Sequence, residues 1–346
     1  MKLLTQILLI IVIFFTSGNL LSADSLFTVN NILLENKKNI SINQLANQAI
    51  IKAYNQLTKR ILLKGDIKKL NNINFKEIKG FVSFYNILEN SDDGLDNINF
   101  SVTFDKDKLH DLFYSRGISY SEVNDKDFYI LPILSTNSNI FIFSNNYFYK
   151  NWNNVEENTL LEFILPLENL EIIQNINRSK NNLLDLEIGN LLQEYENKNV
   201  AIAIIENENN DSEKIYIKTR IQNKIISKSL TLKREKLEKT DFNDKIIYEI
   251  KDELVNLVKS QNLIDIRTPS FLNVKLKLDK DNNLVLLNSK IDKIDLIENI
   301  FIQEFNNDYV KLKIKYLGKL EKIIDQLQNQ NINLQLVNEQ WVIKIS

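Results

Sequence analysis

The apolar residues of this chain fall into many short strand-like runs and a few helical stripes, which limits the folds open to it. Runs of strand length occur at 27–34, 81–88, 98–104, 128–134, 161–165, 200–205, 215–221 and 225–232. The clearest helical stripe, over 242–260, consists of Ile246, Ile247, Ile250, Leu254, Leu257 and Val258. Short strands bury a core only when helices or other sheets pack on them. We therefore expect an α+β protein with several small, mainly antiparallel sheets, each packed by helices.

The N-terminal segment has the order of a secretory signal peptide. Lys2 is the only charge before Asp24, an apolar run follows over 7–15, and the small residues Ser22 and Ala23 close the segment. The run is shorter than the roughly 20 apolar residues that a membrane-spanning helix needs. We expect residues 1–23 to be cleaved after export to a bacterial periplasm. The alternative is an uncleaved segment that anchors the protein in the inner membrane.

Cysteine is absent from the chain, and the formal net charge is −2. Without thiols, an exported protein forms no disulfides, accepts no lipid on cysteine and offers no thiolate metal site or thiol catalysis. A slightly acidic chain also lacks the overall basic field that holds phosphate backbones. We therefore expect no nucleic-acid partner.

Two polar stretches suggest domain boundaries. Residues 177–182 read Asn-Arg-Ser-Lys-Asn-Asn, and residues 267–270 read Arg-Thr-Pro-Ser. They predict three domains after the signal, which are an N-terminal α+β domain (24–178), a middle β-meander with a helix (179–266) and a C-terminal domain (267–346). The last is expected to be ferredoxin-like, because its elements read β-α-β-β-α-β with an extra terminal strand.

Several helix and turn signals are local. Ser41 and Gln44 have capping-box spacing, and Gly65 is a stop signal. Asp105 is placed to cap a second helix that ends before Gly117. The Asp-Gly pair within 91–94 predicts a hairpin turn. The stripe of the first helix consists of Ile42, Leu45, Ala46, Ala49, Ala53, Leu57 and Ile61.

Residues 135–159 show no periodicity and are expected to form a loop. It contains Tyr147, Phe148, Tyr149 and Trp152. Aromatic side chains offer large contact area with few torsions, so these four residues are the candidate recognition site. The alternative is a long segment pinned to its own domain by buried rings.

Signals for catalysis are weak. His110 is the only histidine and follows Asp107 by one turn, an arrangement that would suit a general base. We expect instead a partly exposed helix histidine, and we expect the acidic tract 206–213 to be a solvated hairpin tip. A calcium-like run that begins at residue 279 has Leu284 where glycine is needed and Lys290 where glutamate is needed, so it predicts a turn. We therefore expect no catalytic residues, no metal site and no cofactor.

Several segments together resemble a known family. They are Leu57–Arg60, Gly80–Phe84, Val102–Asp105, Gly117–Tyr120, Ile130–Ile133, Asn151–Trp152 and Leu165–Asn169. Their order and spacing are similar to the proteobacterial family catalogued as domain of unknown function 2066, best over roughly 27–175 and more loosely around 341–343. The resemblance implies a signal peptide, a periplasmic location and no attributed enzymatic activity, and it transfers no catalytic residues.

The export signal, the patterned core and the weak catalytic signals favour a non-enzymatic periplasmic scaffold or binding protein. Its expected partner is another envelope protein, bound through sheet edges or the aromatic residues, with peripheral or N-terminal membrane association. A hydrolase that uses carboxylates or the Asp107–His110 pair is one alternative. A ligand-binding or sensing module is the other, and it would require an apolar pocket with a few polar groups.

Overall fold

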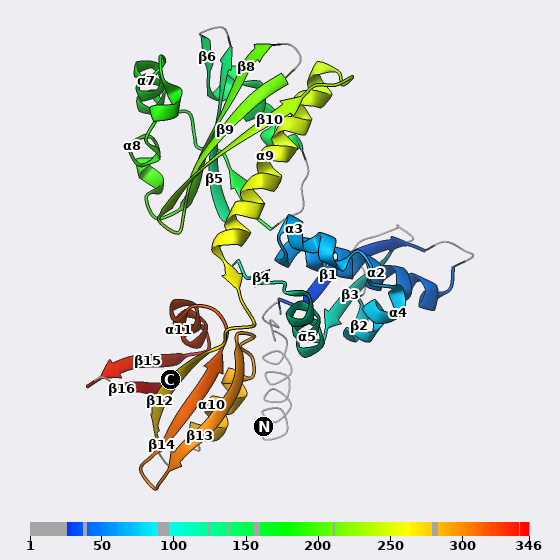
Figure 1. Cartoon of the computed structure of the whole chain (residues 1–346), viewed down its shortest axis with the longest axis vertical. Coiled ribbons are helices and arrows are strands. Elements are labelled where there is room, and N and C mark those ends of the chain that lie inside the picture. Colours follow the sequence, from blue (N-terminus) through cyan, green and yellow to red (C-terminus); the bar gives the residue numbers. More distant parts are fainter. Residues whose placement is uncertain are drawn as a thin grey trace, which may run out of the picture. The chain divides into compact units, whose positions relative to one another are not determined.

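The computed structural model describes residues 26–36, 40–88, 97–123, 125–136, 139–155, 160–209, 212–278, 283–338 and 340–345 (Figure 1). The expected signal peptide (1–23), the hairpin turn (91–94) and residues 279–282 of the calcium-like run lie outside this part. The described part contains three larger sheets, a two-stranded ribbon and helices packed with them, which confirms the α+β class. None of the helices in these ranges is long and apolar enough to cross a membrane.

The chain forms two compact units, and each is described here by itself. Unit 1 comprises Met1–Thr58, Leu70–Ile118 and Asp265–Ser346. Unit 2 comprises Lys59–Lys69 and Ser119–Ile264. Both units are therefore built from segments that are distant in the sequence.

The first sheet of unit 1 is antiparallel, with strand order β1-β3-β2. The stripe expected on the first helix is buried except at Ile42, which is 57% exposed. Tyr54 of this helix lies against Phe104 of the sheet, with ring centroids 6.2 Å apart. The elements are β1 (Thr28–Glu35), α2 (Ile42–Ile61), α4 (Phe75–Gly80), β2 (Val82–Leu88), β3 (Asn97–Phe104) and α5 (Lys106–Arg116).

The caps expected from the sequence are present. The Ser41 backbone N–H donates to Gln44 Oε1 at 2.9 Å, and the Gln44 N–H donates to Ser41 Oγ at 3.3 Å. Asp105 caps α5, and Gly117 ends it at φ 59°, in the left-handed region that favours glycine. Gly65 lies inside the short helix α3 (Lys64–Ile67), since α2 already ends at Ile61.

The C-terminal part of unit 1 has a five-stranded sheet with order β13-β14-β12-β16-β15. The expected element order is present. The extra strand, β16, lies between β12 and β15 and pairs in parallel with β12. The elements are β12 (Ser270–Lys277), α10 (Asn283–Ile291), β13 (Ile297–Phe305), β14 (Tyr309–Tyr316), α11 (Leu320–Asn329), β15 (Ile332–Val337) and β16 (Gln340–Ile345).

Unit 2 is built on a six-stranded mixed sheet with the path β10-β9-β8-β5-β6, to which β7 adds beside β5. The expected meander is confirmed, because β8, β9 and β10 pair successively in antiparallel fashion. The strands are β5 (Asp127–Thr136), β6 (Asn139–Phe141), β7 (Glu162–Ile164), β8 (Asn199–Asn209), β9 (Ser212–Ile221) and β10 (Lys224–Lys233). A small ribbon pairs β4 (Tyr120–Ser121) with β11 (Leu263–Ile264).

Helices cover both faces of this sheet (Figure 1). One core lies under the long helix α9 (Lys239–Gln261), whose expected stripe is wholly buried. The other core lies under α7 (Leu170–Arg178), α8 (Ile188–Leu191) and the 3-10 turn η4 (Leu183–Asp185). The remaining helical elements are η1 (Lys68–Leu70), η2 (Phe143–Asn145), α6 (Tyr147–Asn151), η3 (Trp152–Asn154) and η5 (Gln193–Tyr195).

Two expectations from the sequence need correction. The boundary at 177–182 falls inside unit 2, because β5 before it pairs in parallel with β8 after it, from Phe128↔Asn199 to Thr136↔Asn207. The second predicted boundary lies just after the end of unit 2 at Ile264, but the residues beyond it belong to unit 1 together with Met1–Thr58 and Leu70–Ile118. Residues 135–159 are not a loop, since they contain β6, η2, α6 and η3.

Candidate functional site

The candidate aromatic residues lie on α6 and at the start of η3. Phe148 and Trp152 are 2% and 0% exposed and belong to the core under α9. The Tyr147 hydroxyl donates to Asp244 Oδ1 at 3.0 Å, and the Tyr149 hydroxyl donates to the Pro166 carbonyl at 2.7 Å. Burial and the bond to Asp244 raise the pKa of Tyr147 above its ordinary value. All four rings therefore hold this segment to unit 2, and two of them offer no surface to a partner.

Lys251, in the middle of α9, completes this cluster. It is 5% exposed, and its Nζ donates to the Val155 carbonyl at 2.8 Å. The same ammonium lies 5.6 Å from the ring centroids of both Trp152 and Phe163. Sequence reasoning missed this residue, although a lysine one turn after Ile247 on an apolar stripe was a usable signal of a buried cation. The contacts give Lys251 a structural role.

His110 lies on α5 in unit 1, and the expectation of a partly exposed histidine is wrong. The side chain is 8% exposed, and its ring meets Phe27 edge-on at 5.6 Å. Burial, assisted by Lys106, lowers the pKa of His110 from 6.5 to about 4, while nearby carboxylates including Asp107 act in the opposite direction. The imidazole is therefore neutral at pH 7. Within the described residues, no group of three His, Cys, Asp or Glu side chains could hold a metal ion.

The acidic tract 206–213 is not wholly solvated, contrary to the sequence expectation. Glu213 on β9 is 6% exposed, because its position in the strand alternation turns it toward the α9 side, with Ile215 and Ile217. Burial raises the pKa of Glu213 from 4.5 to about 7, although Lys239 acts to lower it. The carboxyl is thus partly protonated near neutral pH. We assign this carboxyl no chemistry.

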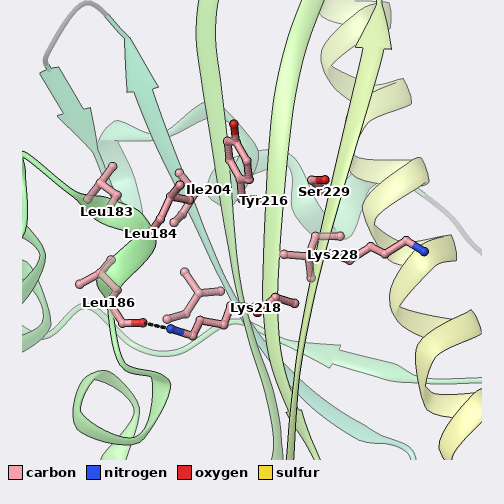
Figure 2. Close-up of a pocket in the computed structure, with 11 residues that line it drawn as sticks. Leu183, Leu184, Leu186, Ile204, Tyr216, Lys218, Lys228 and Ser229 are labelled. Atoms are coloured by element: carbon pink, nitrogen blue, oxygen red, sulfur yellow. Dashed lines mark hydrogen bonds between the residues drawn. The ribbon is translucent and has the colours of Figure 1, made fainter.

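A groove on the opposite face of the sheet is a candidate binding site. It has a volume of about 320 Å³ and lies between η4 and strands β8, β9 and β10 (Figure 2). Its residues are Leu183, Leu184, Leu186, Ile202, Ile204, Tyr216, Ile217, Lys218, Ser227, Lys228 and Ser229. Sites that bind small molecules or peptide side chains combine apolar walls with a few placed polar groups, and this lining has that character.

Strand alternation explains how the groove forms. Ile215, Ile217 and Thr219 point to the α9 side, so Tyr216 and Lys218 point to the side of η4. Ser229 and Ser227 stand directly opposite Tyr216 and Lys218 in the β9–β10 register and are exposed. The helical segments cover β5 and β8 but leave these serines of β10 open. The groove therefore lies on one face of the sheet, where the part covered by helical segments meets the part left open on β10.

The cations near the groove are already engaged. Lys218 Nζ donates to the Leu186 carbonyl at 2.8 Å, which ties β9 to the segment after η4 (Figure 2). Lys228 points toward α9, where its Nζ lies 3.7 Å from Glu253 Oε1 (Figure 2). The polar groups open to an occupant are thus mainly hydroxyls, those of Tyr216, Ser227 and Ser229. This lining favours an apolar occupant over an anion.

Fold and site together define a two-unit α+β protein with an apolar groove beside a sheet edge. No family model and no curated protein matches the chain. Two solved chains match, one of them described as "Crystal structure of uncharacterized protein". That structure is 9% identical, and the match covers 40% of this chain and 100% of that one with a TM-score of 0.17. Similarity at this level carries no argument about the fold or the function of this chain.

Proposed function

We propose that this chain is an exported, non-enzymatic binding protein of the bacterial envelope and that the groove of unit 2 is its binding site. The observation that carries the proposal is the apolar groove of about 320 Å³ that opens beside the edge strand β10. The aromatic residues 147–152 support it less, because Phe148 and Trp152 are buried.

The export part of the proposal rests on the sequence. Residues 1–23 have the order of a signal peptide, and the segments that resemble domain of unknown function 2066 support membership of that family, which we also propose. N-terminal sequencing of the protein from a periplasmic fraction tests export and cleavage together. We expect a mature N-terminus at Asp24. An envelope-bound chain that still begins at Met1 would instead establish the N-terminal anchor.

The occupant we propose is an extended apolar segment of another envelope protein. Within the described residues, β10 pairs only with β9, so its outer backbone groups are available to a further strand. A strand added at a sheet edge gains main-chain hydrogen bonds, and every second side chain points to the same face as the groove. Ile225, 66% exposed on that face, would extend the apolar contact.

A small apolar ligand is the second candidate occupant. The groove volume of about 320 Å³ lies at the lower end of the roughly 300–1,000 Å³ range of small-molecule sites. An environment-sensitive apolar dye, anilinonaphthalene sulfonate, is a practical probe for it. Saturable dye binding that Ser229→Trp abolishes, with no protein adduct in the experiment below, would favour the ligand over the peptide segment.

The test of the peptide segment is site-specific photocrosslinking in cells from position 227 in the groove. Ser229→Trp should fill the groove, whereas Thr231→Trp places the same ring two residues along the same exposed strand face, outside the lining residues. We expect one protein adduct from position 227 that disappears with Ser229→Trp and persists with Thr231→Trp.

A reporter at Tyr248, which is 45% exposed on α9, serves as the positional control. The same adduct from Tyr248, or an adduct from position 227 that persists with Ser229→Trp, would contradict the groove as binding site.

A further inference from the structure

The C-terminal sheet of unit 1 has one face packed by helices and one face rich in lysine. Alternate residues of β12 and β14, including Leu272, Val274, Leu312 and Ile314, are buried on the side of α10 and α11. The residues between them point to the other side. We call this other side the lysine face, and on the adjacent interior strands β12 and β14 it consists of Phe271, Asn273, Lys275, Lys277, Tyr309, Lys311, Lys313 and Lys315.

The register places like charges against one another. Lys275 stands directly opposite Lys311, and such a pair destabilises a sheet. Lysines on edge strands commonly prevent aggregation, but β12 and β14 are interior strands, so that explanation does not apply. The chain as a whole has 43 basic and 45 acidic residues, so five lysines on two adjacent strands are not a reflection of overall charge. An anionic partner would relieve the repulsion.

Some of these lysines are neutralised and others are held by aromatic rings. Lys311 and Lys315 pair with Glu304 at 2.5 Å and Glu298 at 2.6 Å. Lys275 Nζ lies 3.7 Å from the ring centroid of Tyr309, and Lys313 Nζ lies 4.3 Å from that of Phe271. Within the described residues, neither Lys275, Lys277 nor Lys313 forms an ion pair with a carboxylate. Three positive charges on one face are thus left for an external anion.

Exposed apolar side chains accompany the charges. Phe271 is 49% exposed, and Phe301 of β13, opposite Lys313, is 47% exposed. Lysines beside exposed aromatic rings match a bilayer surface, where ammonium groups meet lipid phosphates and rings enter the boundary between headgroups and acyl chains.

We propose that the lysine face docks this protein on a membrane surface that contains anionic phospholipid. Single-stranded nucleic acid is the competing occupant, because it also combines charge with aromatic contact. A base stacked on Tyr309 or Phe271 would have to displace the ammonium already over that ring. The choice of a membrane also rests in part on the proposed export, but the groove of unit 2 has no part in it.

The experiment is vesicle cosedimentation of the full chain with phosphatidylcholine vesicles, with and without phosphatidylglycerol. Each lysine near an anionic surface strengthens binding about fivefold, so replacing Lys275, Lys277 and Lys313 together by Gln should weaken binding to the anionic vesicles about a hundredfold. Residues 1–23 are the same in all variants, so any binding through them appears as a common baseline on neutral vesicles. Raising the salt concentration should weaken the wild type in the same direction.

The matched control replaces Lys290, Lys293 and Lys319 by Gln, which removes the same charge on or next to the helices of the other face. We expect it to retain binding, and thermal unfolding should show both triple variants folded. Equal losses in the two triple variants, or no loss in the lysine-face variant, would overturn the proposal. It would equally fail if the lysine face proved to be required for binding a single-stranded oligonucleotide and not for vesicles. Ser229→Trp should bind vesicles normally, which separates this proposal from that for the groove.

Discussion

Glu213→Gln should stabilise unit 2 at high pH and leave it unchanged at low pH. Burial raises the pKa of Glu213 to about 7, above the ordinary 4.5 of an unfolded chain. The folded state therefore holds the proton more tightly than the unfolded state does. The stability that this proton confers is fully present below pH 4.5 and is lost as the pH rises through 7. Glutamine mimics the protonated acid at every pH.

The size of the effect follows from the two pKa values. A change from 4.5 to about 7 corresponds to roughly 3 kcal/mol if all of it is retained. Glu213 lies near the end of the β8–β9 hairpin, where water and Lys239 screen the charge, so we expect about 1.5–2 kcal/mol above pH 8.

Urea unfolding monitored by tryptophan fluorescence measures this difference in the free energy of unfolding for unit 2 specifically. The chain has two tryptophans, and Trp341→Phe leaves Trp152, buried in unit 2, as the reporter. Both Glu213→Gln and its parent would carry that background substitution and be compared at pH 4.5 and pH 8.5. A stabilisation of equal size at the two pH values, or a destabilisation at pH 8.5, would refute the reasoning that the folded state disfavours a charged carboxylate here.

Three further predictions use the same unfolding assay. Lys251→Met should destabilise unit 2 by about 2 kcal/mol, because the Val155 carbonyl loses its hydrogen-bond donor and the Trp152 and Phe163 rings lose the ammonium beside them. An unchanged unfolding midpoint would mean that the buried ammonium makes no net contribution to stability. His110 has a folded pKa of about 4, below its ordinary 6.5, so the stability it confers is present above pH 6.5 and is lost as the pH falls toward 4. His110→Gln should therefore flatten the pH dependence of unit 1 by about 2 kcal/mol in that window, read from Trp341 in a Trp152→Phe background, and an identical pH profile would contradict this. Gly117→Ala should destabilise unit 1 by about 1 kcal/mol because of its left-handed φ of 59°, with Gly80→Ala, which has open space for a methyl group, as the matched control.

Features decided by neighbouring residues could be predicted from the sequence. The Ser41–Gln44 capping box, the Asp105 cap and the Gly117 terminus each depend on a few consecutive residues, and the structure contains all three. The stripe of α9 follows from helical period alone. The meander was also predictable, because successive strands joined by short turns pair with one another.

Pairings between distant strands could not be predicted in the same way. The polar run 177–182 has the composition of a linker, but it lies in the crossover that connects the parallel strands β5 and β8. The groove has the same origin, because it depends on where η4 lies over strands that follow it in the chain. The burial of Trp152 and Phe148 could not be read from the asparagines and lysine around them, since much of what covers these rings comes from α9, about 100 residues later. The burial of Lys251 and Glu213 depends on which face of the sheet packs against α9, and the sequence alone does not specify that face.

The division of unit 1 into separated segments has a consequence for the order in which the protein folds. Unit 2 has all its residues once Ile264 has been synthesised, whereas unit 1 still lacks Asp265–Ser346. Two hydrogen bonds across unit 1, from Leu26 N–H to Asp295 Oδ2 and from Lys106 Nζ to the Ile297 carbonyl, each 3.4 Å, await these last residues. Domains usually fold from the N-terminus as the chain emerges. Here the unit that begins first in the chain is completed last, so a chain interrupted near residue 264 would carry a complete unit 2 together with a unit 1 that consists only of Met1–Thr58 and Leu70–Ile118.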